Sequence, residues 1–195
     1  MHVTAANRDK NPNPQGKGNL PTLRDLGDFS AAGVRRKTPV EFFRDYCVSS
    51  LVLAARFDFR PVVGRTYYLY SREQGWMLSL VAPQEWGQNL PGDFVAACAL
   101  RPDMTWEVRF DDLADAPQVT DKLQAFVDAF TSALHEQDDV AAHLPRFVAH
   151  LPYYRRLLAS SLAASLDLSS PPQQALRQLL DSSAPLLRLR DAPRD

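Results

Sequence analysis

Residues 66–110 read TYYLYSREQGWMLSLVAPQEWGQNLPGDFVAACALRPDMTWEVRF and contain all three tryptophans and three of the six tyrosines. Apolar and polar side chains alternate along much of this stretch, and glycine, proline and asparagine interrupt it at short intervals. Alternation is typical of strands with one buried face, while glycine and proline mark the turns between strands. The stretch therefore predicts an antiparallel β-meander around which the rest of the chain is organised.

About five strands are expected in this meander, curved into a half-barrel. They are predicted at residues 57–62, 66–71, 76–82, 94–100 and 104–110. Successive side chains of a strand point to opposite faces of the sheet. Thr66, Tyr68 and Tyr70 should therefore share one face, with Tyr67 and Leu69 on the other. The segment Pro83–Gly87 is expected to form a single helical turn, because proline opens it and glycine closes it.

One helix is expected before the strands in the sequence and others after them, which makes the fold class α+β. Thr38-Pro39-Val40-Glu41 combines a capping threonine, a proline at the first helical position and an acidic residue three positions after the cap. This predicts a helix over residues 39–55. Apolar residues then recur with the 3.6-residue period of a helix from Val119 to Leu134 and again from Tyr154 to about Leu166, and a weaker helix is expected from residue 171 to 181.

Three parts of the chain follow from this pattern. Residues 1–37 are expected to be an irregular N-terminal arm, because NPNPQGKG at residues 11–18 combines prolines, glycines and turn formers. Residues 38–168 should form the α+β core domain. Residues 169–195 are expected to hold the weak helix and a disordered tail.

Composition bounds the class of protein. Apolar residues make up 45% of the chain and charged residues 23%, values that are ordinary for a globular domain. No charged region followed by an apolar core marks a signal peptide, and no apolar run has the length of about 20 residues that a membrane span needs. Cys47 and Cys98 sit in apolar patterns and form no closely spaced pair, which predicts two buried thiols in a cytoplasmic protein.

Charge is distributed unevenly although the formal net charge is only −1. Residues 1–72 carry 12 basic and six acidic side chains, while residues 73–143 carry three basic and 13 acidic ones. The two parts can complement each other within the fold, or the basic part can contact nucleic acid. The second alternative predicts that six basic side chains share one face: Arg35, Arg36, Lys37, Arg60, Arg65 and Arg72.

Several motifs of the central stretch resemble one family of proteins. These motifs are YYLY at residues 67–70, an S-x-x-x-P-x-E-W-G run at residues 79–87, Asp93-Phe94, and DMTW at residues 103–106. They are similar to a domain-of-unknown-function family found in bacteria and in an uncharacterised human open-reading-frame protein. The opening NPNPQGKG and the later LPYYRRLLA run look like the bacterial branch of that family. The resemblance implies no reaction, cofactor or catalytic residue.

The residues themselves offer no recognisable catalytic or metal-binding set. A GxSxG motif is absent, and His143 and His150 lack the spacing and the carboxylate of a helical metal pair. No metal and no cofactor are therefore expected. Glu85, Asp93 and Asp103 lie in turns between strands, where carboxylates can perform acid/base chemistry or simply cap the turns. An enzyme built on these three carboxylates is the alternative function.

The leading hypothesis is a noncatalytic binding module. Its contact residues are expected to be Tyr68, Tyr70, Glu85 and Trp86, on an aromatic sheet face and the Pro83–Gly87 turn. Aromatic side chains can stack on a ligand or a peptide, although a half-buried sheet uses the same residues as core. The partner is expected to be a protein or a small molecule and not a membrane. The sequence does not indicate the oligomeric state.

Overall fold

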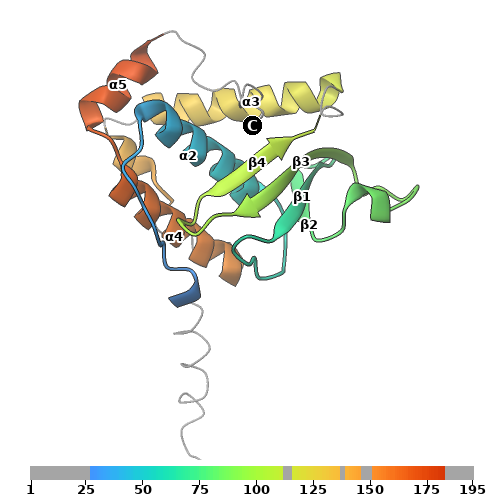
Figure 1. Ribbon diagram of the computed structural model, residues 1–195. Helices are drawn as coiled ribbons and strands as arrows, with labels where there is room; N and C mark the ends of the chain where they lie inside the picture. Colours follow the sequence, from blue (N-terminus) through green and yellow to red (C-terminus); the bar gives the residue numbers. More distant parts are fainter. Residues whose placement is uncertain (1–26, 112–115, 137–138, 146–150, 183–195) are drawn as a thin grey trace, which may run out of the picture.

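The computed structural model describes residues 27–111, 116–136, 139–145 and 151–182. Within these ranges the chain has an α+β fold in which one antiparallel sheet of four strands packs against helices (Figure 1). The strands are β1 (Thr66–Ser71), β2 (Trp76–Ser79), β3 (Asp93–Leu100) and β4 (Trp106–Phe110). The helices are α2 (Pro39–Ala54), α3 (Pro117–His135), α4 (Tyr153–Ser169) and α5 (Gln173–Asp181). The α+β class is confirmed.

The sheet order is β2-β1-β3-β4, and every neighbouring pair is antiparallel. A strict meander would place β3 beside β2, whereas here the connection between them crosses β1 to reach its other edge. Neither the prediction of five strands nor that of a half-barrel is confirmed. The segment at residues 57–62 is not a strand: the bridge to the sheet is made by the preceding residue, Arg56, with Met77. The rings of Phe57 and Phe59 instead pack into or against the core.

The two faces of β1 have different surroundings, as the alternation of its side chains predicts. Tyr67 and Leu69 are fully buried in the core between the sheet and the helices. Tyr68 and Tyr70 point to the opposite face, where their rings meet Phe94 of β3. The helix-side face thus builds the main core, and the outer face carries a separate aromatic layer.

Helix α2 begins as the sequence predicts. The Thr38 hydroxyl accepts a hydrogen bond from the Glu41 amide at 3.3 Å, and the Glu41 carboxylate accepts one from the Thr38 amide at 2.9 Å. Arg35 forms an ion pair of 2.7 Å with Glu41. The hydrogen bond from Arg35 and those from Thr38 lower the pKa of Glu41 to about 2. These contacts satisfy amides that a helix N-terminus otherwise leaves unpaired.

One core joins the sheet to the four helices. Besides α2 and the sheet it includes Leu123 and Phe130 of α3, Leu158 of α4, and Leu176 of α5. Cys47 and Cys98 are free and buried, and burial raises the pKa of both thiols. None of the helices in the described ranges combines the length and the apolar character that crossing a membrane requires.

Candidate binding surfaces

The DMTW motif at residues 103–106 is a tightly bonded turn between β3 and β4. The Asp103 carboxylate accepts hydrogen bonds from the Thr105 amide at 3.1 Å and the Thr105 hydroxyl at 2.6 Å. Met104 adopts a φ of 64°, a left-handed conformation that is rare for a residue with a side chain. The Trp106 amide donates to the Ser49 hydroxyl of α2 at 2.9 Å, and the Trp106 side chain is buried. The motif therefore anchors the sheet to α2.

Lys37 ties the same turn to α2 through buried charges. Its ammonium lies 2.7 Å from the Asp45 carboxylate and 3.2 Å from that of Asp103, and its side chain is only 3% exposed. Arg101 also pairs with Asp45, at 3.1 Å. Burial acts to raise the pKa of Asp103, but the hydrogen bonds from Thr105 and the charge of Lys37 outweigh it, so that the pKa is lowered. Lys37 and Asp103 are structural residues.

The SxxxPxEWG motif bonds mainly to itself and to β1. The Val81 carbonyl accepts a hydrogen bond from the Tyr70 hydroxyl at 2.9 Å and another from the Trp86 indole at 3.3 Å. The Glu85 carboxylate accepts from the Ala82 amide at 3.1 Å, across the short 3₁₀ helix η1 (Pro83–Glu85). The predicted helical turn at residues 83–87 is therefore present as this 3₁₀ helix, which ends at Glu85 with Trp86 as its C-cap.

Four rings on the outer face of the sheet, Tyr68, Tyr70, Trp86 and Phe94, form what we call the outer aromatic cluster. Tyr70 lies at its centre, 6.5 Å from Trp86 and 5.6 Å from Phe94 between ring centroids. Tyr70 is fully buried, and burial is the main cause that raises its pKa. Tyr68 and Trp86 keep part of their surface exposed. Of the three predicted aromatic contact residues, Tyr70 therefore supports the cluster from within, and the other two reach the surface.

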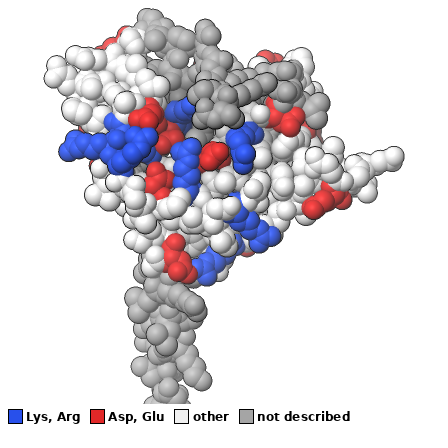
Figure 2. Space-filling view, viewed as in Figure 1, with Lys and Arg blue, Asp and Glu red and all other residues white. Residues whose placement is uncertain are grey.

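The connection between β2 and β3, residues 80–92, projects from the sheet away from the helices (Figure 1). We refer to it as the projecting connection. Leu80 and Leu90 are 40% and 48% exposed, and Glu85 is the single charged residue between positions 80 and 92. Figure 2 shows the projection as a mainly uncharged arm. The predicted residues Glu85 and Trp86 thus lie on a protrusion that exposes two leucines and carries one charge.

The carboxylates of the alternative enzyme hypothesis do not come together. Asp93 begins β3 and Asp103 follows its end, so the eight-residue strand separates them. At about 3.3 Å per residue the length of this strand is roughly 25 Å. Gln118 donates to Asp93 at 3.0 Å, while Asp103 is held by Thr105 and Lys37. Glu85, Asp93 and Asp103 therefore cannot share one pocket, and an active site made of all three is excluded.

Three of the six basic residues singled out in the sequence are paired with acidic side chains within the fold. Lys37 is buried between two aspartates, Arg35 pairs with Glu41, and Arg60 pairs with Asp28. Figure 2 shows blue and red side chains interspersed on the visible face. Phosphate contacts need cations that are free to face the ligand. For these three residues the structure instead favours the first interpretation of the charge pattern, in which charges complement each other within the fold.

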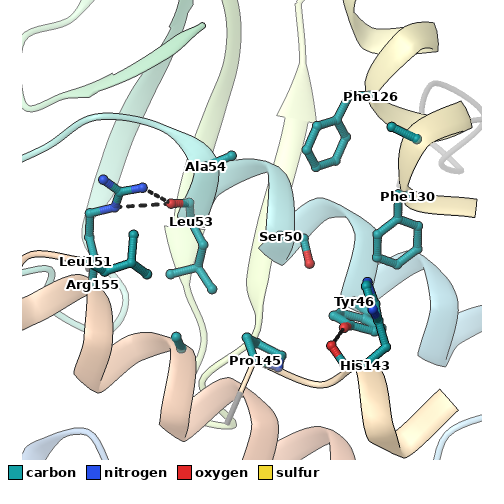
Figure 3. A pocket seen from close by; sticks show the side chains of 12 residues that line it. Tyr46, Ser50, Leu53, Ala54, Phe126, Phe130, His143, Pro145, Leu151 and Arg155 are labelled. Atoms are coloured by element: carbon teal, nitrogen blue, oxygen red, sulfur yellow. Dashed lines mark hydrogen bonds between the residues drawn. The ribbon is translucent and has the colours of Figure 1, made fainter. Parts of the chain in front are cut away.

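A groove that the sequence did not predict lies between α2, α3 and α4 (Figure 3). Its volume is about 500 Å³, and its walls include Tyr46 and Leu53 of α2, Phe126 and Phe130 of α3, and Arg155 of α4. We call it the interhelical groove. Its α2 wall lies more than 70 positions before its α3 wall in the sequence, so that no local motif indicates the groove. A half-buried arginine at the edge of an apolar surface is the feature that could have drawn attention.

Comparison with known families supports the resemblance seen in the motifs. Residues 49–129 match the model of a family described as Protein of unknown function (DUF2452). The predicted relationship to a family of unknown function is confirmed. No solved structure matches the chain.

The DUF2452 match covers the sheet, the projecting connection and the DMTW turn. It also includes the α2 and α3 walls of the interhelical groove from Ser50 onward, as far as Ala129. Arg155 and the rest of the α4 wall lie outside the matched residues. The outer aromatic cluster is thus contained in the matched region, whereas the groove is completed by a helix beyond it.

Proposed function

We propose that this protein is a noncatalytic binding module that engages a partner protein through the projecting connection. The observation that carries the proposal is the exposure of Leu80 and Leu90 beside the partly exposed Trp86, on an arm with a single charge. Protein interfaces have apolar centres from which charged residues are depleted, and tryptophan is enriched among the residues that dominate binding energy. The partner surface is accordingly an apolar pocket with a polar rim.

The internal bonding of the arm supports this role. Tyr70 and Trp86 both donate to the Val81 carbonyl, and the Val81 amide donates to the Ser79 hydroxyl at 3.0 Å. Such contacts fix the shape of the arm before any partner arrives. Binding by a preformed surface loses less conformational entropy than binding by a flexible one. Tyr68, at the edge of the outer aromatic cluster, extends the contact surface.

The same proposal places the protein in the cytoplasm. Its support is the pair of free, buried cysteines, which need no oxidising compartment.

Photocrosslinking at Leu90 tests the proposed interface. Leu90 is replaced by p-benzoylphenylalanine in cells that express the protein naturally, and irradiation is expected to give one discrete crosslinked species. Leu168, which is 67% exposed on α4, is the matched control position. The added substitution Trp86→Ala is expected to remove the species at position 90. Equal crosslinking at both positions, no crosslink at position 90, or a crosslink that persists without Trp86 would each contradict the proposal.

A further inference from the structure

The interhelical groove has the dimensions of a small-molecule site. Its volume of about 500 Å³ falls within the range of roughly 300–1,000 Å³ that is typical of ligand pockets. Two exposed alanines, Ala54 of α2 and Ala129 of α3, belong to its lining. Because these side chains are small, they leave the groove open where larger residues would close it.

One part of the groove is mainly aromatic, with Ser50 and His143 as further polar lining residues. Tyr46 and Phe130 pack edge to face with ring centroids 4.9 Å apart, and Phe126 lies nearby on the same helix as Phe130 (Figure 3). The Tyr46 hydroxyl already donates to the His143 carbonyl at 2.6 Å. Burial raises the pKa of Tyr46, which keeps the phenol neutral. This part of the groove is therefore suited to a hydrocarbon or aromatic body.

The other side of the groove carries a positive charge. Arg155 donates from Nε and Nη2 to the Leu53 carbonyl, at 3.1 Å and 2.6 Å, near the C-terminal end of α2. A guanidinium has five N–H donors in a planar fork. These two contacts use the N–H of Nε and one of Nη2, so that one N–H of Nη2 and both N–H groups of Nη1 remain. Among the described residues no carboxylate lies within ion-pair distance of Arg155, and Asp58 acts on it only from farther away. Figure 3 shows Arg155 on the opposite side of the view from Phe126 and Phe130.

We propose that the interhelical groove binds a small amphipathic carboxylate. The apolar body lies against Leu53, Phe126 and Phe130, and the carboxylate accepts hydrogen bonds from the remaining donors of Arg155. Charge complementarity selects the anion: among the described residues Arg155 has no ion-pair partner, so its half-buried guanidinium gains from an anionic group, and arginine suits the planar carboxylate. This site is separate from the projecting connection, and it can be present or absent independently of the proposed protein partner.

Isothermal titration of the full chain with hexanoate, octanoate and decanoate tests the apolar part of the site. One saturable site per chain is expected. Each added methylene should tighten the dissociation constant about threefold to fourfold until the groove is filled. Ala129→Trp should abolish binding by filling the groove. Ala125→Trp is the matched control, because Ala125 is also an exposed alanine on α3 but does not line the groove.

The charged part is tested by comparing octanoate with octanol. Arg155→Met is expected to weaken octanoate binding about tenfold to a hundredfold, the usual effect of losing hydrogen bonds to a charged group, and to leave octanol unchanged. Arg156→Met removes the same charge from the next residue of α4, outside the groove, and should have no effect.

The proposal is overturned if none of the three acids binds or if octanol binds wild type as tightly as octanoate. Equal weakening by Arg155→Met and Arg156→Met would also overturn it. If Arg155→Met fails to fold, octanoate binding by Ala129→Trp is compared with that by Ala125→Trp. This comparison still tests the groove, because neither substitution changes Arg155. Unchanged octanoate binding by Ala129→Trp would exclude the groove.

Discussion

The DMTW turn and the projecting connection lie near opposite ends of β3, and both carry motif residues and a tryptophan. At the turn, the Trp106 amide and the Asp103 carboxylate bond to residues far away in sequence, Ser49 and Lys37. In the connection, the longest-range hydrogen bond runs from Tyr70 to Val81, only 11 positions apart. One tryptophan is buried in the core and the other is partly exposed on an arm. Motif residues at one end thus hold the fold together, while those at the other shape a surface.

The largest expected difference is between the two tryptophans. Trp106→Ala removes a fully buried side chain and should lower the free energy of unfolding by about 3–5 kcal/mol. Trp86→Ala removes a partly exposed side chain and one hydrogen bond, and it should cost about 1 kcal/mol. Urea denaturation of both variants measures the difference. Equal losses would mean that the connection is as structural as the turn.

Gly92 marks the point at which the projecting connection rejoins the sheet. A Cβ atom at this position would lie 2.1 Å from the Ser71 carbonyl oxygen, which is backbone and cannot move aside cheaply. Gly92→Ala should therefore destabilise the protein by about 2–3 kcal/mol. Gly87→Ala meets no neighbouring atom and only strains a φ of +57°, so it should cost about 1 kcal/mol. Thermal unfolding of the two variants shows which one is less stable. A less stable Gly87→Ala would contradict the close approach of residue 92 to Ser71.

Lys37 tests the charged side of the DMTW turn. Lys37→Met leaves Asp45 and Asp103 without their shared cation and should cost about 2 kcal/mol. This is less than the loss of a wholly buried ion pair, because both aspartates keep other partners and some contact with water. Arg109→Met, which removes an exposed partner of Glu107, should change stability by less than about 0.5 kcal/mol. Chemical denaturation at neutral pH measures the free energy of unfolding of both variants. Similar losses would contradict a structural role for the ion pairs of Lys37.

The smallest effect concerns the exposed capping box of α2. The pKa of Glu41 falls from 4.5 to about 2 in the folded protein. A lowered folded pKa stabilises the fold above the unfolded value, and this stability is lost as the pH falls from about 4.5 to about 2. Because Glu41 is exposed to solvent, the loss should stay below about 1 kcal/mol. Glu41→Gln should flatten this part of the pH profile, and an unchanged profile would contradict the assignment.

Local patterns predicted local structure well. The capping residues Thr38 and Glu41 place the start of α2 correctly, and alternation assigns Tyr67 and Leu69 to the core face. The prediction of a strand at residues 57–62 was wrong. The rings of Phe57 and Phe59 pack into or against the core without the strand pairing that their alternation predicts. Residues 80–82 were also expected to continue the strand, which ends at Ser79. Both errors arise because the partner of a segment decides whether it becomes a strand.

The two proposed binding surfaces depend on contacts that sequence spacing does not reveal. Lys37 was grouped with exposed basic residues, although the fold buries it between Asp45 and Asp103. Tyr70 was expected at the surface and lies beneath the arm that follows it. The interhelical groove needs three helices to pack before it exists. The location of an aromatic surface could be predicted from the motif, but not which of its residues reach the solvent.

The measurement that most directly tests the central claim combines stability and contact in one variant, Trp86→Ala. If the projecting connection is a binding surface, this variant should keep its free energy of unfolding to within about 1 kcal/mol of wild type. It should also lose the crosslink formed from position 90. A variant that unfolds as readily as Trp106→Ala, or that stays stable and retains the crosslink, would contradict the claim.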